Sequence, residues 1–246
     1  MIHYHGGPIT PVSAAISAWT RRHACVSFAY PDQMPIACEV AQSVIADNGA
    51  FTAWKLGQEM NVAGYLDWVN EWCRHPAFDW CLIPDVIDGT EKDNDEQLAW
   101  WPIGKHLSVP VWHLHETIDR LKRLCDDYPR VAFGSSGEFS EIGTDGWWRR
   151  MSKAMDSICD QDGRPRTKLH GLRMLNPTIY SQFPFSSCDS TNVARNIGLD
   201  QKWKGTYQAM TKETRAMILT ERIELHASAA RWAGQIGTQM NFELVG

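Results

Sequence analysis

The sequence predicts an α/β protein, a TIM-type (β/α)8 barrel, and three observations support this fold class. The chain has 246 residues, of which 43% are apolar and 22% are charged, enough to bury the core of one large domain. Eight short apolar runs have the length and composition of strands. Longer amphipathic segments lie between most of them, as βαβ units around a parallel sheet require.

The predicted strands follow one another at spacings that leave room for a helix in most intervals. The first two units look irregular and the last strand is weak, so a doubly wound open sheet remains the structural alternative. The eight predicted strands cover 2–5, 24–30, 43–47, 79–85, 109–115, 130–135, 168–175 and 186–190.

Helix-start signals precede two of the amphipathic segments. Asn61 and Thr117 come directly before apolar-periodic runs, and their side-chain oxygens can accept a hydrogen bond from the first helical turn. The helices between strands are predicted over 61–74, 91–101, 117–127 and 146–160.

The end of the chain predicts additional helix outside the barrel repeat. Residues 206–236 indicate one long helix or two shorter ones, which would close the barrel or pack against its outside. No linker, repeat or low-complexity tract divides the chain. We therefore expect a single domain over 1–246, with the barrel in about 1–200 and a helical tail in about 201–246.

Composition excludes several classes of protein. No apolar stretch approaches the roughly 20 residues of a membrane span, and the first residues lack the features of a signal peptide. The seven cysteines are odd in number and include no CxxC pair, which favours a reduced cytoplasmic protein over a disulfide scaffold or a zinc knuckle.

The charge is unevenly distributed along the chain. The net charge is −5, but residues 1–145 carry 10 basic and 20 acidic side chains, and residues 146–246 carry 14 basic and 9 acidic ones. The carboxyl-terminal part is therefore the candidate phosphate-binding face. Variation of charge along solvated helices explains the same pattern equally well.

Polar residues stand where the predicted strands end, which is where the active sites of barrels lie. A single aspartate at such a position is often a helix cap or a turn residue, but three such aspartates are harder to explain in this way. Carboxylates around one pocket suit covalent glycosyl chemistry and proton transfer. The residues in question are Asp47, Asp85, Asp189, His113, His115, His170, Arg173, Gly134 and Ser135, together with His3 and His5 on the first strand.

Four segments resemble motifs of the tRNA-guanine transglycosylase superfamily, especially its smaller phage-type relatives that exchange guanine in DNA for a 7-deazaguanine. SVIADNGAFT resembles a strand that ends in an Asp-Ser-Gly-Gly-Phe turn, with Asn48 and Ala50 as departures. DWCLIPDVIDGT is similar to the second aspartate strand, and RVAFGSSGEFSEIGT to a glycine loop beside the base pocket. KLHGLRMLNPTIYSQFPFSSCDSTNVARN resembles the block that leads to the nucleophile strand. The segments cover 43–52, 79–90, 130–144 and 168–196.

The resemblance implies base exchange through a covalent intermediate, with a free 7-deazaguanine such as a preQ0-type base as partner and no cofactor. It implies that Asp189 is the nucleophile, Asp47 the general acid and base, and Asp85 a hydrogen-bonding partner of the heterocycle. Gly134 and Ser135 would contact the base through backbone groups. The further candidates for substrate binding are Phe51, His113, His115, His170 and Arg173.

One departure from the superfamily bears on the substrate. The tRNA enzymes carry a zinc site of cysteines and histidine after the nucleophile strand, whereas no cysteine follows Asp189 here. We therefore expect no zinc subdomain and no bound metal, and a DNA substrate rather than tRNA. Candidate phosphate contacts are Arg195, Lys202 and Lys204. If the gene is phage-borne, the location is the host cytoplasm. Membrane association is not expected, and a homo-oligomer is compatible with the sequence.

Two alternative functions stay open at this point. A metal-dependent hydrolase of the amidohydrolase type would use His3 and His5 together with His113 or His115, His170 and Asp189. A barrel that binds nucleotides without catalysis is the other alternative, because a fold by itself does not fix a function.

Overall fold

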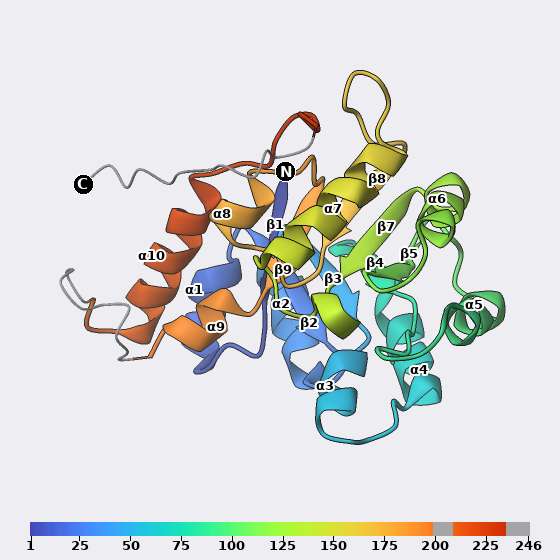
Figure 1. Cartoon of the computed structure of the whole chain (residues 1–246). Helices are drawn as coiled ribbons and strands as arrows, with labels where there is room; N and C mark the ends of the chain where they lie inside the picture. The colour runs from blue at the N-terminus through green and yellow to red at the C-terminus, as the bar shows by residue number, and fades with distance from the viewer. Residues whose placement is uncertain (199–208, 235–246) are drawn as a thin grey trace, which may run out of the picture.

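Nine parallel strands form a nearly closed TIM-type barrel with helices around it (Figure 1). The structure is a computed structural model, and it describes residues 1–198 and 209–234. The predicted fold class is thus confirmed. The strands are β1 (Ile2–Gly6), β2 (His23–Ser27), β3 (Ser43–Asp47), β4 (Phe78–Leu82), β5 (Ser108–Val109), β6 (Val111–His113), β7 (Arg130–Gly134), β8 (Lys168–Gly171) and β9 (Ser187–Ser190).

The strand order is β5-β4-β3-β2-β1-β9-β8-β7-β6, so the two ends of the sheet are β5 and β6. These two strands are successive in the chain and are separated by Pro110 alone. Proline has no N–H for a ladder hydrogen bond, but the carbonyl oxygen of Pro110 accepts one from the N–H of Ala132 at 2.9 Å. β5 and β6 are therefore two halves of one predicted strand, and the barrel closes through Pro110.

Side chains alternate between the inside of the barrel and the layer under the helices, as the pleat of a strand requires. The interior holds an apolar cluster that includes Tyr4, Ile45, Trp80 and Val111. Counting in twos from Ile45, Val111 and the interior residue Ala132 reaches Asp47, His113 and Gly134 at the last inward positions of β3, β6 and β7. On β9, Asp189 pairs with the inward-facing Tyr4 of β1 and therefore faces the interior too.

Helices follow most strands and cover the outside of the barrel (Figure 1). Asn61 accepts a hydrogen bond from the N–H of Gly64 at 3.0 Å, and Thr117 from the N–H of Arg120 at 3.2 Å, so both predicted caps are confirmed. The helices are α1 (Val12–Trp19), α2 (Met34–Val40), α3 (Ala50–Lys55), α4 (Val62–Trp72), α5 (Glu91–Trp100), α6 (Ile118–Asp127), α7 (Asp145–Ile158), α8 (Pro177–Tyr180), α9 (Asn192–Asn196) and α10 (Lys212–Glu224), with short 3-10 turns at Pro31–Gln33 and Gly137–Phe139.

The helical tail is shorter than predicted. α10 ends at Glu224, and residues 225–234 contain no helix. After the helix the chain crosses to a different surface, where the indole of Trp232 stacks on Phe183 and its Nε1 donates to Asp156 at 2.7 Å. The predicted helix over 206–236 is therefore confirmed at 212–224 and wrong at 209–211 and 225–234, and its residues 206–208 and 235–236 lie outside the described part. Among the described residues, no helix has the length and apolarity to cross a bilayer.

Candidate active site at the carboxyl ends of the strands

A pocket opens at the carboxyl ends of the barrel strands. The pocket and its open mouth together contain about 490 Å³ of empty space. Loops from both halves of the barrel contribute to its wall. The lining residues are Asp47, Asn48, Phe51, Leu82, Asp85, Ile87, His113, Gly134, Ser135, Ser136, Leu172, Arg173 and Asp189.

Asp189 stands on β9 with its carboxylate 11% exposed. Its Oδ1 accepts a hydrogen bond from the backbone N–H of Arg173 at 3.1 Å and lies 3.2 Å from Nε2 of His170. Burial lowers the pKa of His170, and its Nδ1 lies 2.8 Å from the hydroxyl of Ser187. Within the described residues Oδ2 of Asp189 receives no hydrogen bond, so it is the oxygen available to a ligand.

Arg173 follows β8 in a left-handed backbone conformation, with φ of 60°. This region is uncommon for residues other than glycine, and here it accompanies the N–H contact with Asp189. The guanidinium donates to the carbonyl oxygen of Ser135 at 2.8 Å and lies 4.3 Å from the ring centre of Phe51. One residue thus connects the carboxylate, the loop after β7 and the aromatic wall of the pocket.

Asp47 ends β3 and faces the same pocket. Its Oδ1 accepts hydrogen bonds from the hydroxyl of Ser27 at 2.7 Å and from the N–H of Gly49 at 2.9 Å. The pKa of Asp47 is raised to about 6, chiefly by burial and also by the charges of Asp189 and Asp85, while the two hydrogen bonds lower it. A carboxyl group in this range can both give and take a proton near neutral pH.

Asp85 lies in the loop after β4 and is held by two side chains. Its Oδ1 accepts a hydrogen bond from Nδ2 of Asn48 at 2.7 Å, and its Oδ2 lies 2.8 Å from Nε2 of His113. Nδ2 of Asn48 also donates to the carbonyl oxygen of Ile83 at 2.9 Å. Both carboxylate oxygens therefore already have a nitrogen of the protein beside them.

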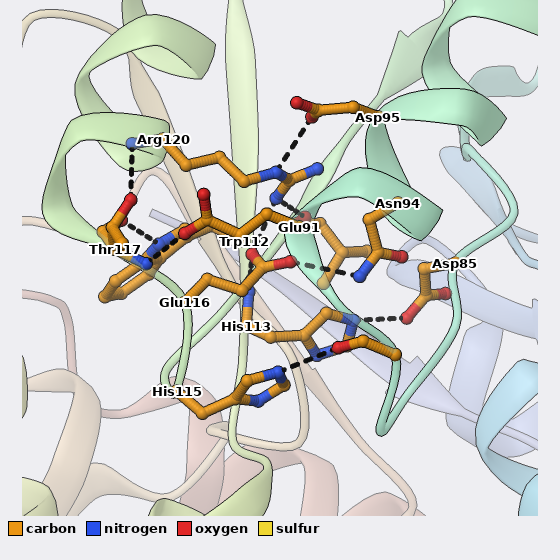
Figure 2. Close-up of polar contacts among 12 residues, drawn as sticks. Asp85, Glu91, Asn94, Asp95, Trp112, His113, His115, Glu116, Thr117 and Arg120 are labelled. Carbon is orange, nitrogen blue, oxygen red and sulfur yellow. Dashed lines mark hydrogen bonds and ion pairs between the residues drawn. The ribbon is translucent and has the colours of Figure 1, made fainter.

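A buried ion pair supports His113 from behind (Figure 2). Glu116 and Arg120 are each 2% exposed, and Nη1 of Arg120 donates to Oε2 of Glu116 at 2.6 Å. The same Oε2 accepts from the backbone N–H of His113 at 2.8 Å, while Oε1 accepts from Asn94 at 3.0 Å. The carboxylate thereby fixes the end of β6.

The structure brings most of the predicted site residues to this pocket. Two others occupy neighbouring places: His170 lies in the barrel interior beneath Asp189, and His115 connects Ser136, at 2.8 Å, with the carbonyl oxygen of Gly89, at 3.2 Å. The predicted residues among the pocket lining are Asp47, Phe51, Asp85, His113, Gly134, Ser135, Arg173 and Asp189.

Of the three predicted phosphate contacts, the structure describes only Arg195. Arg195 is exposed on α9, and its charge is close enough to Arg173 to lower the pKa of that guanidinium, although burial is the larger cause. Lys202 and Lys204 lie outside the described residues.

The histidines of the first strand do not reach the pocket. Their neighbour Tyr4 packs in the barrel interior, so both point outward. Nε2 of His3 lies 3.0 Å from the carbonyl oxygen of His226, and Nε2 of His5 lies 2.9 Å from Oε1 of Glu224 on α10. Over residues 1–198 and 209–234, no three His, Cys, Asp or Glu side chains are grouped as metal ligands.

Several residues of the site escaped the sequence reasoning. Asn48 stands out in the sequence only as a departure from a motif, yet its position directly after the aspartate of β3 is a usable signal. Glu116 and Arg120 carry an i, i+4 charge pattern that is common on helix surfaces, so nothing in the sequence marked them as buried. The remaining unpredicted lining residues are Leu82, Ile87, Ser136 and Leu172.

Comparisons with family models, with curated proteins and with solved structures found no match to this chain.

Proposed function

We propose that this protein is a base-exchange glycosyltransferase that replaces guanine in nucleic acid, DNA rather than tRNA, with a free 7-deazaguanine. The observation that carries the proposal is the pairing of Asp189 and Asp47 in one pocket. One carboxylate has a free oxygen, and the other has a pKa near 6. Such a pair supplies a nucleophile and a proton donor for one bond cleavage.

In the first step, Oδ2 of Asp189 attacks C1′ of the target nucleotide. The C1′–O bond forms as the C1′–N9 bond to guanine breaks, and the leaving base takes a proton from the carboxyl group of Asp47. The Arg173 N–H and His170 hold the other oxygen of Asp189. They fix the carboxylate in position without occupying its attacking oxygen.

In the second step, the incoming base loses its proton to Asp47, and its nitrogen attacks C1′. The ester bond to Asp189 breaks and restores the carboxylate. One N-glycosidic bond replaces another, so the exchange needs no redox or energy-supplying cofactor. With a pKa of about 6, roughly a tenth of Asp47 is protonated at pH 7, enough to serve both steps.

The surroundings of the pocket support nucleic acid as the polymer. Arg173 lines the pocket, and Arg195 stands exposed near it, where cationic side chains would contact phosphates. A base must leave its stack to reach such a pocket. All seven cysteines are free, in keeping with a reaction in the cytoplasm, which is the host cytoplasm if the gene is phage-borne.

The test is the transfer of radiolabelled guanine into duplex DNA, single-stranded DNA and tRNA. We expect incorporation into DNA by the wild type and none by Asp189→Asn. Asp67→Asn, on the exposed face of α4, is the matched control and should retain activity. Denaturing electrophoresis should reveal a covalent protein–DNA species that requires Asp189.

Three results would contradict the proposal in different ways. Incorporation into tRNA alone would overturn the choice of polymer. Undiminished exchange by Asp189→Asn would overturn the assignment of the nucleophile. Base or nucleotide binding without exchange or a covalent species would identify a non-catalytic binding protein.

A further inference from the structure

His113 combines burial, a charged neighbour and an unused nitrogen within the pocket. It is 2% exposed, ends β6 and lines the pocket beside Gly134. Nε2 lies 2.8 Å from Oδ2 of Asp85, although their alignment is not that of a full hydrogen bond. Nδ1 has no hydrogen-bond partner in the part of the chain that the structure describes.

The neighbour of Nε2 determines which nitrogen carries the proton in the neutral ring. An unprotonated nitrogen would be repelled by a carboxylate oxygen at 2.8 Å, so Nε2 carries it. Nδ1 is then left as an acceptor. Leaving a buried acceptor without a donor costs free energy, and a ligand in the pocket can remove that cost by donating an N–H.

Nδ1 is buried, and the fold leaves the position beside it without a side chain. Gly134 pairs with His113 in the sheet, and a Cβ at position 134 would lie 3.1 Å from Nδ1. Any other residue there would press on the nitrogen. The ring itself is held by the contact of its backbone N–H with Glu116 and by stacking on His115, with ring centres 5.7 Å apart. The direction of Nδ1 is therefore fixed before a ligand arrives.

We infer that Nδ1 of His113 is the acceptor that reads an N–H donor of the heterocycle, and that Asp85 is a positioning residue that sets the tautomer of His113. The inference rests on the proposed function for the class of ligand, a planar base with ring or exocyclic N–H groups. It differs from the expectation that Asp85 itself meets the base, because Asn48 and His113 already stand at both of its oxygens.

The first experiment measures the tautomer, independently of any activity. Long-range ¹H–¹⁵N spectra of the ¹⁵N-histidine-labelled full chain should show Nε2 protonated and Nδ1 unprotonated for His113 at neutral pH. In Asp85→Asn the two tautomers should mix. A protonated Nδ1 in the wild type, or an unchanged tautomer in Asp85→Asn, would overturn the inference.

The second experiment measures binding of free bases by calorimetry, using guanine, hypoxanthine, which lacks the exocyclic amine, and 1-methylguanine, which lacks the N1–H. The wild type should bind guanine about 5- to 100-fold more tightly than the analogue that lacks the donor read by His113. His113→Leu should lose this preference, and His113→Asn, whose amide oxygen replaces the acceptor, should recover part of it. His106→Leu, at an exposed histidine, is the control.

The outcomes separate this inference from the proposed function. A preference that survives in His113→Leu overturns the inference even if base exchange takes place. If no exchange takes place but the binding preference depends on His113, the proposed reaction is overturned and the role of His113 as hydrogen-bond acceptor is supported. Failure of the wild type to bind guanine overturns the inference, because the class of ligand would be wrong. Thermal unfolding of each variant identifies a folding defect. If His113→Leu does not fold, the binding preference of His113→Asn tests the inference instead.

Discussion

The backbone N–H of Arg173 donates to Oδ1 of Asp189 at 3.1 Å from a left-handed conformation with φ of 60°. The contact joins the loop after β8 to the carboxylate on β9, and the side chain of Arg173 continues it to Ser135 and Phe51. The position of the proposed nucleophile thus depends on a backbone geometry that few residue types adopt easily.

Substitutions at Arg173 should separate its backbone role from its side-chain role. Arg173→Gly keeps the N–H and adopts the left-handed region at no steric cost, whereas Arg173→Val adds a β-branched residue there. We expect the valine variant to be less stable than the glycine variant by about 1–3 kcal/mol in urea unfolding. Equal stabilities would show that the conformation imposes no requirement on residue 173.

The raised pKa of Asp47 predicts a pH-dependent gain in stability for Asp47→Asn. The folded protein holds the proton up to about pH 6 and the unfolded chain only to about pH 4, so wild-type stability falls as the pH rises through this window. At pH 8 the variant should be about 1–3 kcal/mol more stable than the wild type, with no difference left near pH 4. Urea unfolding at both pH values measures this.

The same variant should lose the proposed base exchange. Removal of a general acid and base lowers rates by about 10²–10⁴-fold. Stability gained together with activity lost would be the signature of a functional carboxyl group. A variant that is destabilised at pH 8 would contradict the burial argument.

The lowered pKa of His170 predicts a contribution to stability with the opposite pH dependence. Burial lowers its pKa, so below the ordinary value of about 6.5 the unfolded chain binds a proton that the folded protein does not. Its contribution to stability is present above that value and is lost as the pH falls. His170→Gln should therefore lose less stability than the wild type between pH 7 and pH 5. Parallel pH profiles for the two proteins would contradict this.

Removing one partner of the ion pair between Glu116 and Arg120 should strongly destabilise the protein. Arg120→Met leaves the carboxylate buried without its cation, and we expect a loss of about 3–5 kcal/mol. Adding Glu116→Gln to this variant should restore at least about 1 kcal/mol. Arg123→Met, which removes an exposed cation 2.7 Å from Asp95, is the control and should cost less than about 1 kcal/mol.

The sequence indicated the barrel because each strand repeats the same local pattern, and the ends of those strands identified Asp47, Asp85, His113 and Asp189. It did not indicate the break at Pro110, because a proline within an apolar run does not reveal which neighbours the two halves pair with. In a strand that continued to residue 115, His115 would lie on the same side as His113, but β6 ends at His113, and beyond a strand this alternation no longer applies.

Long-range contacts set the other limits of sequence reasoning. The helical pattern after Glu224 was outweighed by the packing of Trp232 on Phe183, which no local pattern encodes. His3 and His5 lie on one face of β1 because strand side chains alternate, but only the interior packing of Tyr4 shows that this face is the outer one.

The pairing of β1 with β9 has a consequence for synthesis of the chain. β1 leaves the ribosome first, but one of its two neighbours is the last barrel strand to be made. Until residues 187–190 emerge, one side of β1 is an unpaired edge, which is open to wrong partners. A nascent chain released before that point would carry Asp47, Asp85 and His113 without Asp189, so closure of the ring and completion of the carboxylate set happen in a single event.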